Sequence, residues 1–321
     1  MIEVVVHERR VEAQGVVSLD LRPTADGATL PAFTAGAHVD VLVPQCAGDG
    51  LMRQYSLCND PDESHRYVIA VGRDPAGRGG SATLCDRVIA GDTLRISAPR
   101  NNFSLNEQAA ESIFIAGGIG ITPLLAMARR LSRLQRRWTL YLCARTPERA
   151  AFLAEAQRLA GTVMAVFDGV PGGASLDLAG VAGPAPQDAH LYCCGPEPML
   201  RAFQRACAGR DPATVHVEWF SPPTPPSGQA GKDHAFTVHL QRSGRSVIVP
   251  AGRSILDVLL ASGIEVAHSC CDGVCGTCET RVLAGSPDHR DAVLLGEEAN
   301  ARDRMMLCVS RCTGDALTLD L

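Results

Sequence analysis

Residues 268–279 read His-Ser-Cys-Cys-Asp-Gly-Val-Cys-Gly-Thr-Cys-Glu, and they decide how the C-terminal part of the chain folds. Counted from Cys270, the stretch has the spacing C-x4-C-x2-C, and Cys308 follows after a gap of 29 residues. This spacing is typical of a plant-type [2Fe–2S] cluster, in which one loop supplies three thiolates and a distant segment supplies the fourth. Gly273 and Gly276 suit such a loop, because its amides must turn inward toward the cluster.

The expected ligands are therefore Cys270, Cys275, Cys278 and Cys308. A structural zinc site is the alternative, but zinc sites usually pair two short cysteine hooks, and only Cys312 lies close to Cys308 in the sequence. A ligand at Cys271 would shorten the first spacing to C-x3-C, so we expect Cys271 to be a bystander. The stretch predicts a one-electron redox centre.

The bulk properties of the chain exclude several classes of protein. Its 321 residues suffice for two or three domains, and 46% hydrophobic content supports real cores. No run of about 18 apolar residues predicts a membrane span, and the N-terminus reads as a strand rather than a signal peptide. Thirteen cysteines without a secretion signal indicate the reducing cytoplasm, and a net charge of −5 gives no reason to expect nucleic acid.

Residues 1–103 have an all-β pattern. Short alternating runs separated by turn residues predict a barrel or a sandwich, with one short helix around Ala82–Ala90. The expected strands are Glu3–His7, Val16–Leu21, His38–Val43, Tyr67–Val71 and Thr93–Ser97.

Residues 104–222 alternate between strands and helices, which predicts a doubly wound parallel sheet. The expected strands are Ser112–Ala116, Trp138–Ala144, Val163–Phe167, His190–Cys194 and Val215–Trp219. A helix is expected from Thr122 to Gln135, with Thr122 as its N-cap and Pro123 at its first position.

A proline-rich stretch, Ser221–Gly231, is the clearest linker, and we place the boundary segment at residues 223–233. Residues 234–321 then predict a small β-grasp unit. It begins with a hairpin of Phe236–Leu240 and Ser246–Val249, and Ser254 and Asp257 form a capping box for the helix that follows. The charged stretch Asp288–Asp303 predicts a solvated face.

Two glycine-containing stretches and one strand end are candidate binding sites in the first 222 residues. Gly117-Gly-Ile-Gly120 lies between a strand and a helix, where amides and the helix dipole favour a pyrophosphate, although a tight structural turn is the alternative. Arg78-Gly-Gly-Ser81 is a second anion-binding candidate. Cys193-Cys194-Gly195-Pro196 follows a strand end, where ligands collect in open α/β sheets, but inert buried thiols are equally compatible.

Arg53-Gln-Tyr-Ser56 lies between the expected strands of the first domain. Its guanidinium, aromatic ring and hydroxyl suit a phosphate and a flat ring system. A solvated loop is the alternative for this stretch and for Arg78–Ser81.

Taken in order, these motifs resemble the phthalate dioxygenase reductase family, whose close relatives include the vanillate demethylase reductases. The resemblance covers essentially the whole chain, and a C-terminal ferredoxin is specific because related reductases carry the ferredoxin first. It implies a multidomain fold with an antiparallel β-barrel flavin domain, a doubly wound α/β nucleotide-binding domain and a C-terminal β-grasp ferredoxin domain of the plant type. The chain departs from the family at Cys271, where a polar or acidic residue is expected, and at Gly72, where relatives often carry a basic one.

The resemblance also implies the cofactors FMN, NADH and a [2Fe–2S] cluster. The implied flavin contacts are Arg53, Gln54, Tyr55, Ser56, Ala70, Val71 and Gly72, with Arg78, Gly79, Gly80 and Ser81 at the phosphate. Thr122 matches the junction of flavin and nicotinamide, and Phe220 matches an aromatic residue that covers the flavin ring. The implied NADH site consists of Gly117, Gly118, Gly120, Arg145 and Cys194. Ser56 and Cys194 are the expected catalytic residues, and Ser56 is expected to hydrogen-bond near the flavin N5.

The function implied by the family is that of an NADH-dependent reductase component, which passes electrons through FMN and the cluster to a Rieske-type oxygenase or demethylase acting on an aromatic acid or similar compound. We expect a cytoplasmic monomer whose partners are NADH and the oxygenase, without nucleic acid or membrane. A redox sensor without steady turnover is the alternative, but the chain leaves no residues for a regulatory module.

Overall fold

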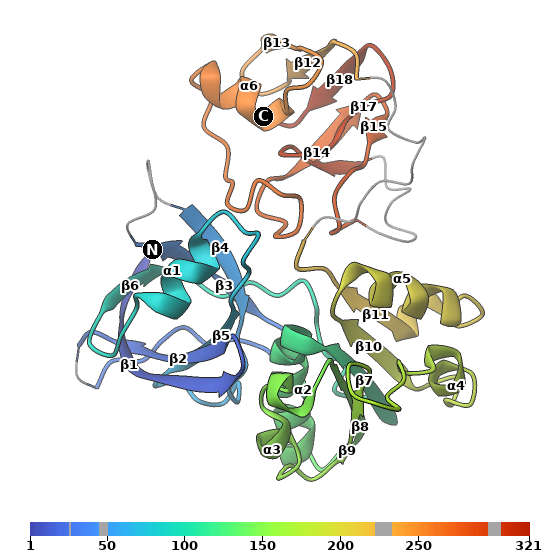
Figure 1. Cartoon of the computed structure of the whole chain (residues 1–321). Coiled ribbons are helices and arrows are strands. Elements are labelled where there is room, and N and C mark those ends of the chain that lie inside the picture. Colours follow the sequence, from blue (N-terminus) through green and yellow to red (C-terminus); the bar gives the residue numbers. More distant parts are fainter. Residues whose placement is uncertain (26, 45–50, 222–232, 295–302) are drawn as a thin grey trace. The chain divides into compact units, whose positions relative to one another are not determined.

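The computed structural model describes residues 1–25, 27–44, 51–221, 233–294 and 303–321. Contacts within the chain divide it into two compact units, Met1–Glu218 and Trp219–Leu321 (Figure 1). The boundary predicted at residue 103 lies inside the first unit, between its two sheets. Of the predicted linker, only Ser221 and Asp233 are among the described residues.

The first part of unit 1 is an antiparallel β-barrel. Its strands are β1 Ile2–Ala13, β2 Val16–Pro23, β3 His38–Val43, β4 Leu51–Ser56, β5 Tyr67–Gly72 and β6 Thr93–Ile96, and helix α1 spans Gly80–Asp86. The strands pair in the order β4-β3-β6-β1-β2-β5. A further bridge between Leu57 and Ile69 joins the two edges and closes the barrel.

Alternation explains most of the barrel. Leu19, Leu21 and Ile69 point inward and are buried, and they pack with Val39 and Val41 from the other side. Strand β4 differs, because Arg53–Ser56 forms part of a strand and does not lie between strands as predicted. Its polar residues hide the hydrophobic pattern that reveals the other strands.

The second part of unit 1 is a parallel sheet with helices on both faces. Its elements are β7 Glu111–Gly117, η1 Gly118–Gly120, α2 Ile121–Arg133, β8 Arg137–Ala144, η2 Pro147–Arg149, α3 Leu153–Ala156, β9 Thr162–Phe167, α4 Leu178–Ala182, β10 His190–Cys194, α5 Glu197–Ala206, η3 Pro212–Thr214 and β11 Val215–Glu218. The strand order β11-β10-β7-β8-β9 reverses between β7 and β10. This reversal is the switch point at which doubly wound sheets bind ligands.

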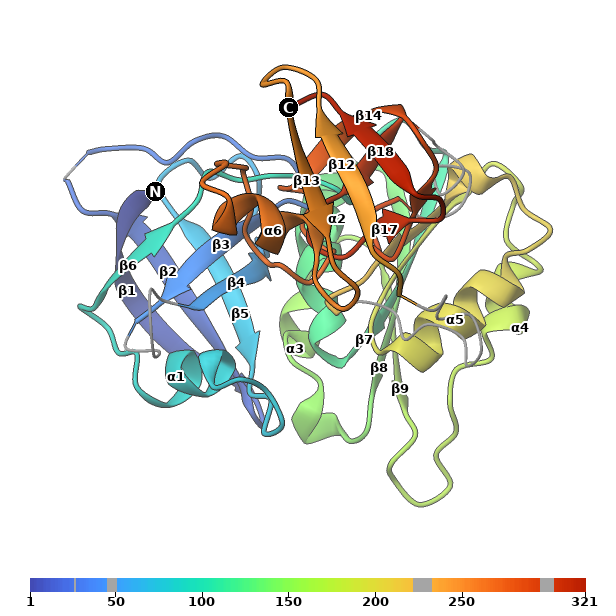
Figure 2. The ribbon, with the colours of Figure 1, turned by 90° about the horizontal axis from the view of Figure 1, so that it is seen from above.

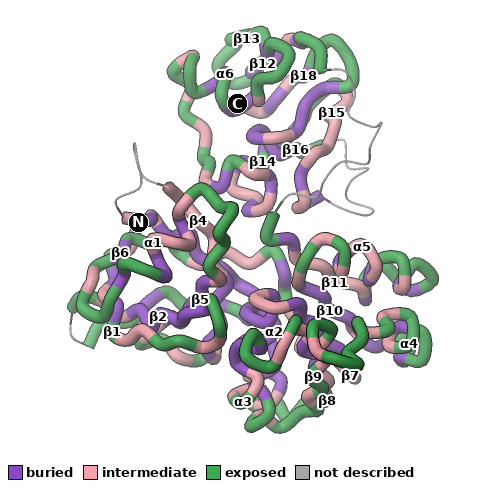
Figure 3. Tube along the Cα trace, viewed as in Figure 1, coloured by how far each residue is buried: buried purple, intermediate pink, exposed green. Residues whose placement is uncertain are grey.

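The start of helix α2 differs from the prediction. Gly120, not Thr122, is the N-cap, because the 3-10 turn η1 leads directly into the helix. Thr122 lies inside the first turn, where its hydroxyl donates a hydrogen bond to the carbonyl of Ile119 at 3.0 Å. Most of α2 is buried, from Ile121 to Ala128 without a break (Figure 3).

Unit 2 has the β-grasp arrangement. Its elements are β12 Phe236–Leu240, β13 Arg245–Val249, α6 Ile255–Ala261, β14 Glu279–Ala284, β15 Pro287–Asp288, β16 Arg304–Met306, β17 Arg311–Cys312 and β18 Ala316–Leu319. The main sheet runs β13-β12-β18-β14-β16, and α6 lies beside it (Figure 2). The buried residues of α6 belong to the same hydrophobic core as those of the sheet. The predicted capping box of Ser254 and Asp257 is present at the start of α6.

Candidate functional site

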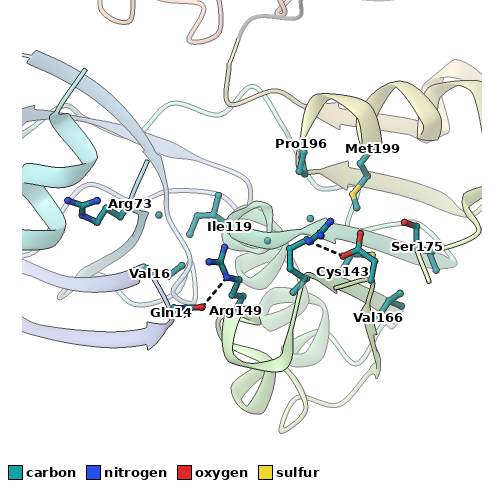
Figure 4. A pocket seen from close by; sticks show the side chains of 18 of the residues that line it. Gln14, Val16, Arg73, Ile119, Cys143, Arg149, Val166, Ser175, Pro196 and Met199 are labelled. Atoms are coloured by element: carbon teal, nitrogen blue, oxygen red, sulfur yellow. Dashed lines mark hydrogen bonds and ion pairs between the residues drawn. The ribbon is translucent and has the colours of Figure 1, made fainter. Parts of the chain in front are cut away.

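A cavity of about 450 Å³ lies where the barrel meets the parallel sheet in unit 1 (Figure 4). The barrel contributes the β1–β2 turn and the end of β5, and the sheet contributes the segments that follow β7, β8, β9 and β10. Four residues implied by the resemblance line this cavity: Gly72, Gly117, Gly118 and Arg145. Gly120, Thr122 and Cys194 are buried beside it and are absent from its described lining.

The glycines after β7 do not all serve the same purpose. A side chain at Gly120 would place its Cβ 2.1 Å from the Cys194 carbonyl oxygen, and one at Gly117 would lie 2.5 Å from Pro196 Cδ. These two glycines let the loops after β7 and β10 pack together at the switch point. Gly118 has a φ of +55° and open space above its Cα, so it is the glycine that leaves room for a ligand.

The rim of the cavity is charged. The Arg145 guanidinium lies 3.6 Å from the Asp168 carboxylate, and Arg149 donates a hydrogen bond to the side chain of Gln14 at 3.0 Å (Figure 4). A further bond runs from the backbone N–H of Gln14 to the carbonyl of Glu148. The turn of the barrel and the loop after β8 are thus tied together at the cavity mouth.

On the barrel, Arg53 of β4 packs over the first residue of α1. A Cβ at Gly80 would lie 3.2 Å from Arg53 Cγ and 2.9 Å from Leu51 Cδ2, so the missing side chain makes room for the arginine. The guanidinium therefore lies beside the Arg78–Ser81 turn. In the same turn, the Ser81 hydroxyl accepts a hydrogen bond from the Asp74 N–H at 3.1 Å.

The remaining barrel residues implied by the resemblance lie on β4 and β5. The Gln54 amide donates to Asp40 at 2.7 Å, and Arg100 binds the same carboxylate. The other members of this set are half-buried Tyr55 and the buried residues Ser56, Ala70 and Val71. Because their side chains are buried, Ala70 and Val71 offer a flavin mainly their backbone.

Cys194 ends β10 as a fully buried thiol that faces Glu218 at the end of β11. The sulfur donates toward Glu218 Oε2 at 3.9 Å. Burial raises the pKa of Glu218 to about 8, and burial together with the neighbouring carboxylate raises the pKa of Cys194 well above its ordinary value. Both groups therefore hold their protons more tightly than usual, next to the switch point. Phe220, two residues further on, has 44% of its surface exposed.

The four spaced cysteines of unit 2 are buried and their thiols meet. Cys270 contacts Cys275 and Cys308, and Cys278 contacts Cys308. Thiols that donate from Cys275 and Cys308 lower the pKa of Cys270. These contacts link all four sulfurs into one group, which suits a [2Fe–2S] cluster held by four thiolates. Among the described residues, no group of three or more Cys, His, Asp and Glu side chains is arranged to hold one metal ion.

Cys271 is exposed, whereas Cys270 is buried. The φ of Cys271 is +56°, which turns its side chain outward, and its thiol faces the carbonyl of Ser269. The backbone N–H of Asp272 instead donates to the Cys270 sulfur at 3.3 Å. Donors of this kind stabilise thiolate charge, so the loop fits a cluster bound through Cys270.

Several cavity residues were not predicted from the sequence. On the sheet side they include Cys143, Arg149, Asp168, Ser175 and Met199. Cys143 and Asp168 lie at or just after the ends of β8 and β9, so the expected strand ends would have indicated them. Gln14, Val16 and Arg73 come from the barrel, and no local pattern indicates that a β1–β2 turn meets a nucleotide-binding sheet.

A barrel that shares one cavity with a doubly wound sheet, joined to a β-grasp unit with four contacting thiols, defines a modular electron-transfer reductase. Residues 238–313 match the family model of the 2Fe-2S iron-sulfur cluster binding domain. Among the described residues, no helix combines the length and the hydrophobicity that a membrane span requires.

Similar proteins cover the whole chain. The chain is 48% identical to phenoxybenzoate dioxygenase subunit beta of Ectopseudomonas oleovorans, covering 98% of this chain and 96% of that protein. It is 44% identical to vanillate O-demethylase oxidoreductase of Pseudomonas putida, covering 100% of both. The solved structure of phthalate dioxygenase reductase, described as modular for electron transfer from pyridine nucleotides to [2Fe-2S], matches with 39% identity and a TM-score of 0.71, over 100% of this chain and 98% of that one.

The chain therefore belongs to the phthalate dioxygenase reductase family and is an oxidoreductase. The predicted family, fold class and cofactor set of FMN, NADH and [2Fe–2S] are confirmed. The roles of individual residues stay predictions.

Proposed function

We propose that the chain is the NADH-dependent reductase of a two-component Rieske-type oxygenase, and that the cavity of unit 1 is where NADH meets the flavin. The observation that carries this proposal is the shared lining, in which Gly72 of the barrel and Gly117 and Gly118 of the sheet face one space. Hydride transfer needs the two reactants in contact and aligned, and a cavity between the barrel and the sheet provides that.

On the barrel side, the proposed role of β4 and α1 is to hold FMN. Arg53 and the Arg78–Ser81 turn would bind the phosphate, because guanidinium and inward amides form charge-assisted hydrogen bonds with phosphate oxygens. Tyr55 and the backbone of residues 70–72 would bound the ring, and Ser56 would hydrogen-bond at its reactive edge. Phe220 is proposed as the residue that covers the ring.

On the sheet side, the proposed role of the loops after β7, β8 and β10 is to hold NADH. The open face of Gly118 admits the pyrophosphate, and Arg145 with Asp168 bounds the ribose end. Thr122 and Cys194 would support the nicotinamide end from the buried layer beneath. The apolar residues at the switch point would exclude water from the reacting groups.

When bound, the cofactors supply the redox chemistry: hydride acceptance by FMN and one-electron transfer by the [2Fe–2S] cluster. The protein holds the four thiolates in unit 2 and delivers electrons to the oxygenase. Asp272 and Glu279, next to the cysteine loop, are proposed docking residues. We place the reductase in the cytoplasm, where thiols stay reduced, and expect it to act as a monomer.

Replacing one cysteine sulfur by oxygen separates reduction of the flavin from electron transfer through the cluster. Cys278→Ser removes a cluster ligand, so NADH-driven reduction of cytochrome c or of the oxygenase is expected to fall to background. NADH oxidation by ferricyanide, which takes electrons from the flavin, is expected to stay at the wild-type rate. Cys271→Ser is the matched control, because Cys271 is an exposed cysteine of the same loop, and both activities should remain.

Loss of both activities in Cys278→Ser would contradict this division between the two units. The sensor alternative predicts a different result, namely that the wild-type protein reduces cytochrome c only once per chain and then stops. Continuous turnover of cytochrome c with excess NADH would exclude it.

A further inference from the structure

Asp291 is a buried acid in the segment between β15 and β16 of unit 2. The sequence predicts a solvated face for Asp288–Asp303, of which residues 295–302 lie outside the described residues. For Asp291 this prediction is wrong, because only 3% of its surface is exposed. A buried carboxylate is costly unless its oxygens are bonded. The bonds that Asp291 makes therefore indicate what it is for.

One oxygen of Asp291 organises its own segment. Oδ1 accepts hydrogen bonds from the backbone N–H groups of Val293 at 3.1 Å and Leu294 at 2.7 Å. Next to them, the N–H of Ala292 donates to the carbonyl of Gly273 at 2.9 Å. Gly273 lies inside the loop that carries the first three cysteines, so the Asp291 segment holds that loop by its backbone.

The other oxygen reaches the segment of the fourth cysteine. Oδ2 accepts a hydrogen bond from the Ser310 hydroxyl at 3.0 Å, and Ser310 is fully buried two residues after Cys308. The Ser310 oxygen in turn accepts the N–H of Arg290 at 3.3 Å. His289 adds a contact, with Nδ1 3.7 Å from Oδ2.

Gly273 shows how closely the three segments approach one another. Its φ is +73°, and a Cβ there would lie 2.6 Å from Val309 Cγ2 and 3.2 Å from the Cα of Asp291. No side chain fits between the cysteine loop, the Asp291 segment and the residue after Cys308.

The bonds also keep Asp291 ionised. Burial acts to raise its pKa, but His289, the N–H of Leu294 and the Ser310 hydroxyl outweigh burial and lower the pKa below its ordinary value. A carboxylate accepts hydrogen bonds through both oxygens, so it can hold both segments at once.

We infer that Asp291 is a positioning residue for the iron–sulfur cluster: it fixes the loop of Cys270, Cys275 and Cys278 to the segment of Cys308. This inference rests on the four-cysteine site of the proposed function and adds the residue that holds its two parts in register. Groups that orient metal ligands affect metal retention strongly without touching the metal.

The experiment compares cluster retention in the full-length holoprotein and its variants Asp291→Ala, Asp291→Asn and Ser310→Ala. Iron release into excess chelator is followed anaerobically by the visible absorbance, and the reduced cluster is characterised by electron paramagnetic resonance. Asp320→Ala is the matched control, because Asp320 forms an exposed pair with Arg242 that involves neither cysteine segment. NADH oxidation by ferricyanide reports on unit 1 in every sample.

Asp291→Ala and Ser310→Ala are expected to release iron about tenfold faster than wild type and to change the resonance line shape. Asp291→Asn should release iron at a rate between those of these variants and wild type, because its amide oxygen still accepts hydrogen bonds from the two N–H groups. Wild-type release rates and spectra in both Ser310→Ala and Asp291→Asn would overturn the inference, even if Asp291→Ala fails to fold. A wild-type protein that takes up no iron would overturn the proposed function, and this inference with it.

Discussion

Arg53 shows how the position of one side chain depends on a glycine in another element. Its stem fills the space above Gly80, which brings the guanidinium to the Arg78–Ser81 turn. From the sequence, Arg53 is an arginine in a polar stretch, and the local pattern does not indicate a strand. Only the pairing of β4 with β3 and the closure of the barrel place it.

Replacement of Arg53 tests its proposed role at the phosphate. Arg53→Ala is expected to weaken FMN binding about 10- to 100-fold, since a charge-assisted hydrogen bond contributes about 1.5–3 kcal/mol. Fluorescence of released flavin on dilution measures the affinity. Arg87→Ala, at an exposed arginine just after α1, should bind FMN like the wild type. Equal affinities for all three proteins would show that Arg53 does not contact the phosphate.

Glu218 gives unit 1 a pH dependence with a definite sign. Its pKa is about 8 in the folded chain against 4.5 ordinarily, so the folded state holds the proton more tightly. Stability is therefore lost as the pH rises from about 4.5 to about 8, because the unfolded chain releases the proton first.

Glu218→Gln removes this titration. As the pH rises from about 5 to about 8, the unfolding free energy of the variant is expected to increase by about 1–2 kcal/mol relative to that of wild type. This is less than the full pKa shift implies, because Glu218 keeps part of its surface in solvent. Thermal unfolding at both pH values measures the difference, with Glu3→Gln, an exposed site, as control. Parallel pH profiles for the variant and wild type would mean that Glu218 is ionised in the folded protein.

At the scale of elements, the turn from β7 through η1 into α2 combines packing with binding. From the sequence alone, its glycines are compatible with either a pyrophosphate cradle or a tight structural turn. Gly117 and Gly120 are needed for close packing, whereas Gly118 faces the cavity with room for a ligand. A sequence pattern cannot separate these uses, because the contact at Gly120 comes from Cys194, far along the chain.

Alanine at two of these glycines should separate the two uses. Gly120→Ala places a methyl against the Cys194 carbonyl, so we expect a loss of about 3 kcal/mol in stability. Gly118→Ala meets no atom and costs only the left-handed backbone, about 1–2 kcal/mol, but it should raise the KM for NADH. Urea unfolding and steady-state ferricyanide assays give both quantities. An unchanged KM in Gly118→Ala would remove Gly118 from the NADH site.

Helix α2 also fastens the sheet to the barrel at its other end. Arg130 and Arg133 bind Asp62, and Arg133 also binds Asp60, in the loop that follows β4. Exposed ion pairs contribute little one by one, but this group joins the sheet and the barrel through one rigid element. Its charges are visible in the sequence, whereas their partners are not.

For the whole molecule, the sequence was sufficient for the class of fold and for the family. The parallel sheet follows from alternating strands and helices, and the β-grasp unit from its hairpin, capping box and cysteines, because these signals are local and periodic. The cavity residues Gln14 and Arg73 and the buried Asp291 could not be predicted, since each acquires its role from a segment distant in sequence. The predicted domain limits, 1–103, 104–222 and 234–321, stay predictions.

In the proposed relay, one chain passes electrons from NADH through FMN to a [2Fe–2S] cluster. An anaerobic NADH titration of the purified protein, followed by its visible spectrum, tests it most directly. The flavin and iron–sulfur bands are both expected to bleach, and the protein is expected to take up about three electrons per chain, two on the flavin and one on the cluster. Bleaching of the flavin alone, with no iron–sulfur band in the spectrum, would contradict it.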